Sequence, residues 1–133
     1  MEGVQEQRPE GHEAARTIDP DNRLLAYGDP AIARALRLIH TRFAEPLDIA
    51  QIAREAGLSR TVLGERFIRL LGEPPMRYRT RWRLKMAADM LLDGGSAGQI
   101  AYAVGFNSEA AFNRAFKRHY GLPPIIWRRE SSH

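Results

Sequence analysis

The sequence predicts an all-α domain in which two helix-turn-helix units are joined by a long central helix. Apolar residues recur at intervals of three and four from Asp29 onward, and one block of sequence occurs twice. No stretch alternates between apolar and polar residues as a half-buried strand does. Helices therefore account for the expected domain, residues 29–129, and residues 130–133 are left as a short tail.

Residues 1–28 differ in composition from the domain that follows. They combine Glu, Asp, Gly and Pro with few apolar side chains, which is typical of a linker or disordered arm, although Leu24, Leu25 and Tyr27 could pack against the domain. Residues 1–29 hold seven acidic and three basic residues, whereas residues 30–133 hold nine acidic and 17 basic residues. The net charge of +4 is thus the sum of −4 and +8, and the basic part suggests a polyanionic partner.

Each expected helix is bounded by residues with helix-cap or helix-breaking chemistry. The N-caps are Asp29, Asp48, Ser59, Ser96 and Ser108, and Gln51 and Gln99 stand where a capping box needs them. The helices end at Pro46, Gly57, Gly72, Gly94, Gly105 and Gly121. The expected helices span about residues 30–43, 49–56, 60–71, 75–92, 97–104, 109–120 and, as a last short turn, 124–129.

The repeated block forms two units, at about residues 48–72 and 96–121, on either side of the central helix 75–92. The first copy reads Ile52-Ala53, Gly57-Leu58-Ser59, Leu63, Phe67 and Gly72-x-Pro74-Pro75. The second copy reads Ile100-Ala101, Gly105-Phe106, Ser108, Phe112, Phe116 and Gly121-x-Pro123-Pro124. The offset is 48 residues before the turn and 49 after it, so the second turn holds one extra residue.

In each copy a short apolar helix, a glycine turn and a capping serine precede a longer amphipathic helix. This is the helix-turn-helix pattern, whose second helix, at about 60–71 and 109–120, lies in the major groove of DNA. Short corners of this kind also occur as plain packing units, so one copy alone leaves both interpretations open. Two copies on a basic domain favour DNA binding.

The most specific stretch of the sequence is Ile100-Ala101-x-x-Val104-Gly105-Phe106-x-Ser108-x-x-x-Phe112-x-Arg114-x-Phe116-Lys117-Arg118-x-Tyr120-Gly121-x-Pro123-Pro124. It is similar to the C-terminal signature of the AraC/XylS family of bacterial transcription regulators, and residues 29–129 resemble the family's complete DNA-binding domain. The resemblance implies a seven-helix domain that binds specific double-stranded DNA, with its two recognition helices in successive major grooves at promoters. Full-length relatives usually carry an effector-binding β-barrel before this domain, and residues 1–28 are too short to form one.

Placing Leu63 and Phe67 in the core leaves one face of each recognition helix turned outward. These faces carry Arg60, Thr61, Gly64, Glu65 and Ile68 in the first helix and Glu109, Ala110, Asn113, Arg114 and Lys117 in the second. An arginine at position 114 can bind guanine bidentately, and an asparagine at 113 suits adenine. The resemblance implies base-reading positions at Thr61, Gly64, Glu65, Glu109, Ala111, Asn113 and Arg114.

Two residues of the first recognition helix leave alternatives open. Gly64 has no side chain to read a base with, so it either allows a close approach of the backbone to DNA or reflects weak readout by this helix. Glu65 either accepts a hydrogen bond from cytosine or forms a helical ion pair with Arg69.

Phosphate contacts are expected from Arg60, Lys117 and Arg118, from the N-termini of both recognition helices, and from Arg77 and Arg81 of the central helix. Arg77, Arg81 and Lys85 form one stripe of that helix, and Arg79 and Arg83 lie almost opposite. Both stripes cannot face DNA, so one is solvated or, in the case of Arg83, paired inside the domain. The apolar residues between them are too broadly spread for one stripe, which predicts a helix packed by both units.

Other function classes find little support. The chain has no cysteine, and the four histidines (His12, His40, His119 and His133) lack metal-binding spacing, so we expect no enzyme, no metal and no cofactor. His40 and His119 are expected at the surface or at helix ends. No signal peptide and no apolar run of membrane-spanning length is present, so a cytoplasmic, nucleoid-associated location is expected.

Two alternatives to DNA recognition remain. One is an interaction module that contacts RNA polymerase or a full-length relative, and the other is a basic helix at 75–92 that lies on a membrane surface. The isolated domain is expected to be monomeric, or dimeric through missing or N-terminal segments.

Overall fold

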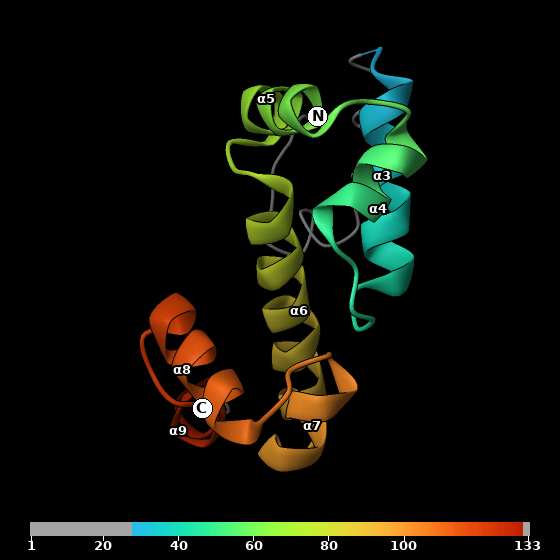
Figure 1. Ribbon diagram of the computed structural model, residues 1–133. Helices are drawn as coiled ribbons and strands as arrows, with labels where there is room; N and C mark the ends of the chain where they lie inside the picture. The colour runs from blue at the N-terminus through green and yellow to red at the C-terminus, as the bar shows by residue number, and fades with distance from the viewer. Residues whose placement is uncertain (1–27, 132–133) are drawn as a thin grey trace, which may run out of the picture.

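The computed structural model describes residues 28–131 (Figure 1), so the predicted acidic arm, including Leu24, Leu25 and Tyr27, lies almost wholly outside the described residues, as do residues 132–133. Within the described range there are seven helices and no strand. The helices are α3 (Pro30–Arg42), α4 (Ile49–Ala56), α5 (Arg60–Leu71), α6 (Pro75–Leu92), α7 (Ala97–Ala103), α8 (Glu109–Tyr120) and α9 (Pro124–Ser131). The all-α prediction is confirmed, and α9 runs two residues further than expected because nothing after Arg129 breaks a helix.

Side-chain caps start the helices where the sequence predicts. Asp48 and Gln51 form a complete capping box at α4, with both hydrogen bonds at 2.8 Å. Ser59 and Ser108 cap α5 and α8 by accepting a hydrogen bond from the backbone N–H three residues later. At α7 only half of the expected box is seen among the described contacts, because Ser96 accepts from the Gln99 N–H without the reciprocal bond.

The described residues form two hydrophobic cores, one in each helix-turn-helix unit. The first lies among α3, α4, α5 and the start of α6, and contains Leu36, Leu63 and Phe67, each 0% exposed. The second lies among the end of α6, α7, α8 and α9, and contains Phe112 and Phe116, also 0% exposed. Burying a large apolar side chain stabilises a fold by about 1.5–3 kcal/mol, so each unit has its own source of stability.

Helix α6 is the strut between the two units, with α3, α4 and α5 around one end and α7, α8 and α9 around the other (Figure 1). Its first half contributes Tyr78 to the first core, and its second half contributes Leu84, Ala87 and Leu91 to the second. The broad apolar surface of this helix follows from that double role, and the prediction that both units pack on it is confirmed.

Candidate nucleic-acid interface

The exposed face of α5 carries the residues that were predicted to point outward. Leu63 and Phe67 are buried in the first core, and Arg60, Thr61, Glu65 and Ile68 are consequently exposed. Gly64 is half-buried, yet a Cβ built on it would have no heavy atom within 4 Å outside its own helix backbone. The glycine is therefore not required by packing inside the domain.

Glu65 is available for an external partner. The ion pairs formed among residues 28–131 do not include one between Glu65 and Arg69. The helical pair considered as the alternative for Glu65 is thus absent from the structure.

Helix α8 presents a more polar face. Glu109, Arg114 and Lys117 are exposed, whereas Asn113 and Ala111 are half-buried. Ala111 lies directly beneath the cap, because its N–H donates to Ser108 Oγ at 3.0 Å. The side-chain oxygen of Asn113 is enclosed and has no hydrogen-bond partner in the structure, so reading an adenine would require this amide to turn outward.

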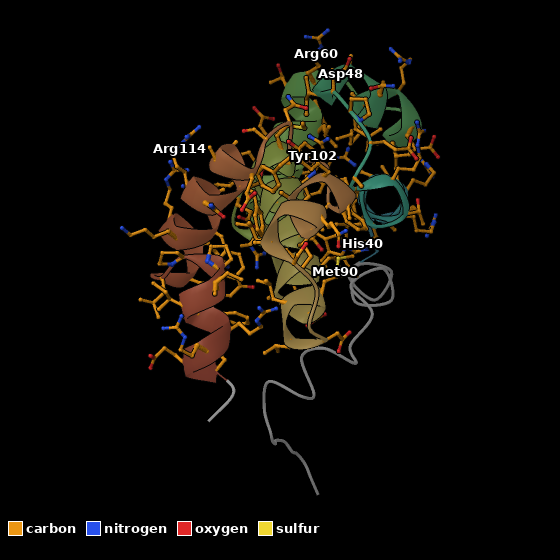
Figure 2. All side chains as sticks on the ribbon, turned by 90° about the horizontal axis from the view of Figure 1, so that it is seen from below. His40, Asp48, Arg60, Met90, Tyr102 and Arg114 are labelled. Carbon is orange, nitrogen blue, oxygen red and sulfur yellow. The ribbon has the colours of Figure 1, made fainter. Side chains whose placement is uncertain are left out.

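The two recognition helices each place an outward arginine on one side of the molecule. Figure 2 shows Arg60 of α5 and Arg114 of α8 at the outer edge, both pointing toward the upper part of the view. His40 and Met90 lie lower in that view. One rod-shaped partner can therefore meet both helices at once.

Three of the predicted phosphate-binding arginines come together in one hollow. Arg77 and Arg81 of α6 and Arg118 of α8 line a cavity of about 320 Å³ between the two helices. Arg81 is not free within it, because its guanidinium Nε donates to Glu73 Oε2 at 2.7 Å. This ion pair, which spans the first two turns of α6 and the Pro74–Pro75 junction, was not predicted from the sequence. The hollow thus has two unpaired arginines and one neutralised one.

The opposite stripe of α6 faces the protein. Arg83 Nε donates to the Phe43 carbonyl oxygen at 2.6 Å and its Nη2 to the Glu45 carbonyl oxygen at 3.2 Å, and Arg79 also donates to Glu45 O. Burial lowers the pKa of both arginines, and Arg79 adds repulsion that lowers the pKa of Arg83 to about 10. Their hydrogen bonds hold both guanidinium groups against the loop after α3, so neither is available to DNA.

The two histidines of the described domain take different positions. His119 is exposed in the last turn of α8, as expected, and it also lines the hollow with Arg77 and Arg118. His40 lies at the end of α3 but is half-buried rather than at the surface, with its Nε2 2.6 Å from the Tyr78 hydroxyl and its ring tilted against that of Trp82 at a centroid distance of 4.2 Å. An aromatic partner 38 residues away explains why the sequence did not reveal this position.

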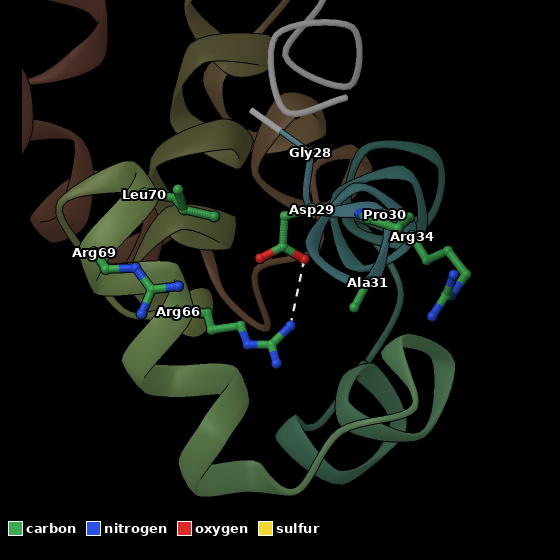
Figure 3. Close-up of a pocket in the computed structure, with 8 residues that line it drawn as sticks. All are labelled: Gly28, Asp29, Pro30, Ala31, Arg34, Arg66, Arg69 and Leu70. Atoms are coloured by element: carbon green, nitrogen blue, oxygen red, sulfur yellow. Dashed lines mark ion pairs between the residues drawn. The ribbon is translucent and has the colours of Figure 1, made fainter. Parts of the chain in front are cut away.

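A second hollow lies away from the exposed faces just described, between the start of α3 and the side of α5. Its volume is about 670 Å³, and Arg34, Arg66 and Arg69 line it (Figure 3). Arg66 pairs with Asp29 at 3.6 Å, and Arg34 donates to the carbonyl oxygens of Glu55 and Ala56 at the end of α4. Two of its three arginines therefore already have structural partners.

Other kinds of site find no support in residues 28–131. No three His, Asp or Glu side chains of this range gather closely enough to hold a metal ion. In the same range, no helix combines the length and apolarity that crossing a lipid bilayer requires.

Comparison with known proteins identifies the family. The family model of a helix-turn-helix domain matches residues 52–130, which include both glycine turns and both recognition helices. A Streptomyces lividans protein described as an AraC-like transcription regulator is 39% identical over 107 residues, covering 80% of this chain and 35% of the relative. The chain belongs to the AraC/XylS family.

Further relatives agree with an AraC-type domain. The transcriptional regulator AlkR of Acinetobacter baylyi is 32% identical over 118 residues, which cover 88% of this chain and 39% of AlkR. These relatives are named as transcription regulators, in agreement with the expectation that the chain is not an enzyme. The chain spans well under half the length of either relative.

Solved structures support the same fold. A transcriptional regulator of Chromobacterium violaceum with an AraC-type DNA-binding domain has a TM-score of 0.73 at 31% identity, covering 79% of this chain and 95% of that one. The DNA-binding domain of AdpA, in complex with a target DNA, has a TM-score of 0.66 at 27% identity, covering 77% of this chain and 92% of that one. The AraC-type domain of this chain therefore has a fold that binds DNA in a relative.

Proposed function

We propose that this chain binds specific double-stranded DNA as a transcription regulator, with α5 and α8 in successive major grooves. The observation that carries the proposal is the exposure of both recognition helices on one side of a basic domain. The 18 residues of α6 span about 27 Å, which is compatible with two major grooves roughly 34 Å apart on one face of DNA.

The binding site is asymmetric in this proposal. Arg114 and Asn113 of α8 supply hydrogen-bond donors to base edges, whereas α5 offers Thr61, Glu65 and a glycine. Glu109 and Ala111 complete the base-facing set of α8. A symmetric repressor dimer reads a palindrome, but two unlike helices on one chain read two unlike half-sites.

Phosphates are bound around these helices by arginine and lysine. Arg60 lies at the start of α5, and Lys117 and Arg118 lie in the last turn of α8. The hollow lined by Arg77 and Arg118 is wide enough to accept a phosphate between α6 and α8. Arg81 contributes less than the other arginines, since Glu73 already neutralises it.

Selection of binding sites from random duplexes at moderate salt tests the proposal. We expect one asymmetric sequence to be enriched, and its affinity to fall steeply with salt because several phosphates are neutralised. If no sequence is enriched over bulk DNA, the specific-regulator proposal fails. A co-purification with RNA polymerase in that case would favour the interaction module instead.

A cytoplasmic location and a regulator's contact with RNA polymerase both follow from the proposed role. The proposal is for one chain per site, because each chain has both recognition helices. Sedimentation of the chain on its selected duplex measures that ratio.

A further inference from the structure

The two units are joined by a second contact besides α6. The loop between α3 and α4, residues 43–48, belongs to the first unit by sequence, yet it touches the second. Phe43, the residue that ends α3, packs against the second core, which is formed by the end of α6 with α7, α8 and α9. No helix of the first unit packs closely on a helix of the second in the described residues, and this loop is a place where the units meet away from the strut.

Arg83 binds the loop to the strut. Its guanidinium donates to the carbonyl oxygens of Phe43 and Glu45, and it also lies 5.8 Å from the ring centre of Phe106 in the second turn. A charged donor on a carbonyl oxygen makes a stronger hydrogen bond than a neutral one. Arg83 thus contacts the loop of the first unit and the turn of the second with one planar group.

Gly105 of the second unit lies directly against the loop and Arg83. A Cβ built on this glycine would lie 2.7 Å from the Ala44 carbonyl oxygen and 2.8 Å from the guanidinium carbon of Arg83. Neither backbone carbonyl nor guanidinium could stay in place at such distances. The second unit approaches the loop as closely as it does because position 105 has no side chain.

The equivalent glycine of the first unit shows that this crowding is not a requirement of the turn itself. Gly57 also has a positive φ, of 74°, but its built Cβ would lie 3.8 Å from the nearest atom, in ordinary contact. Gly105 has a φ of 102° and is crowded by the other unit. The turn requires a glycine in both copies, and only in the second copy does the glycine also set a distance between units.

We propose that the contact among Ala44, Arg83 and Gly105 fixes the orientation of the second unit relative to the first. Arg83 and Gly105 are then positioning residues that determine which spacing of half-sites the chain accepts, although neither belongs to the DNA-facing set. The effect on half-site spacing rests on the proposed function, whereas the fixed orientation of the two units does not.

Distance measurements without DNA test the orientation. The chain has no cysteine, so spin labels can be placed at Glu55→Cys in α4 and Tyr102→Cys in α7, both exposed. Electron–electron double resonance should give one narrow distance distribution for this labelled chain. Gly105→Ala and Arg83→Met should each broaden or shift it.

Gly94→Ala is the matched control. Gly94 has a φ of 99°, close to that of Gly105, but its built Cβ meets nothing within 4 Å. The control therefore carries the same backbone strain without the contact between units, and the distribution should stay narrow. Arg83→Met keeps the inference testable if Gly105→Ala does not fold, and circular dichroism checks the helix content of every variant. Unchanged distributions for both test variants would overturn the inference.

A second experiment measures DNA binding. It uses the duplex obtained by selection, with the two half-sites moved apart or together by one base pair. Joint engagement raises affinity by about 10²-fold or more over a single half-site, so the wild type should lose about that factor on misspaced duplexes. Gly105→Ala and Arg83→Met should reduce the discrimination between spacings to a few-fold, while binding to each half-site alone is unchanged. Full discrimination in these variants would contradict the proposal. If no duplex is selected at all, the proposed function fails, and the distance measurements still decide the orientation.

Discussion

The recognition helices α5 and α8 are built alike inside and differ outside. Each starts at a serine cap and buries two side chains, Leu63 and Phe67 in α5 and Phe112 and Phe116 in α8. On the exposed faces, Gly64, Glu65 and Ile68 of α5 stand where α8 has Asn113, Arg114 and Lys117. A duplicated unit can keep its fold while its exposed residues acquire different chemistry. The buried residues contribute mainly to the free energy of folding, whereas the exposed residues contribute mainly to the free energy of binding a partner.

The difference indicates a division of labour between the units. At these three matched positions α8 has two exposed cationic side chains, Arg114 and Lys117, and the half-buried amide of Asn113, whereas α5 has one carboxylate, an apolar side chain and open space above its glycine. We therefore expect α8 to supply most of the discrimination between bases. We expect α5 to contribute mainly to positioning the domain on DNA, and substitutions in the two helices can separate these roles.

The largest effect is expected from opening the second core. Phe116→Ala should lower the free energy of unfolding by about 3–5 kcal/mol, because Phe116 is 0% exposed and packs against the rings of Phe112, Tyr120 and Trp127. Urea denaturation followed by circular dichroism measures the loss. Phe67→Ala is the matched change in the first core, and a loss below about 1 kcal/mol in either variant would contradict the view that each unit depends on its own core.

The next effect concerns base readout by α8. Arg114→Ala should weaken binding to the selected duplex by about 1–3 kcal/mol and relax the preference at one base pair, because a bidentate contact to guanine is lost. Fluorescence anisotropy on duplexes with each base at that position measures both changes. Glu65→Ala in α5 is the comparison, and a larger loss of discrimination there would reverse the assignment of roles.

Lys117 should act without regard to sequence. Lys117→Ala is expected to weaken binding to selected and unrelated duplexes alike, and to reduce the slope of log affinity against log salt by about one unit, because one phosphate contact is removed. Ile68, its counterpart in α5, carries no charge, so Ile68→Ala should leave the salt slope unchanged. A salt slope that responds to neither change would exclude a phosphate contact by Lys117.

Gly64 allows the two interpretations of α5 to be separated. Gly64→Ala should raise the free energy of unfolding by about 0.5–1 kcal/mol, since alanine favours the helix and the added Cβ meets open space. Thermal denaturation measures this gain. A simultaneous loss of affinity for the selected duplex would show that the backbone approaches DNA at this position, and unchanged affinity would show weak readout instead.

The smallest effect is a pH dependence of stability that arises from His119 in the second unit. Partial burial of the ring in the hollow and the nearby charge of Arg81 lower the pKa of His119 from its ordinary value of 6.5, although Glu73 opposes the shift. The unfolded chain therefore binds a proton more readily, so stability is complete above about pH 6.5 and falls as the pH drops through the folded value. His119→Gln should flatten the stability curve slightly between pH 7 and 5. The counterpart in α5 is Leu70, and Leu70→Met should leave the curve's slope unchanged.

Much of the domain could be predicted because its signals are local. Asp48 and Gln51, three residues apart, predict the start of α4, and the spacing of Leu63 and Phe67 by about one turn indicates the buried face of α5. The pairing of Arg81 with Glu73 and the aromatic contact of His40 with Trp82 could not be predicted, because their partners are brought together by the turns between helices. The enclosed oxygen of Asn113 likewise depends on neighbouring packing.

The sequence by itself determined the helices, their duplication and the exposed residues of each recognition helix, because caps, glycine turns and apolar spacing act over three or four residues. Only the tertiary structure decided which arginines of α6 are free and how the two units are joined. The partners of Arg79 and Arg83 lie 34 to 40 residues away, in the loop after α3, and that loop meets Gly105 from the other unit. Contacts of this kind depend on the packing of both cores at once, so no local sequence pattern predicts them.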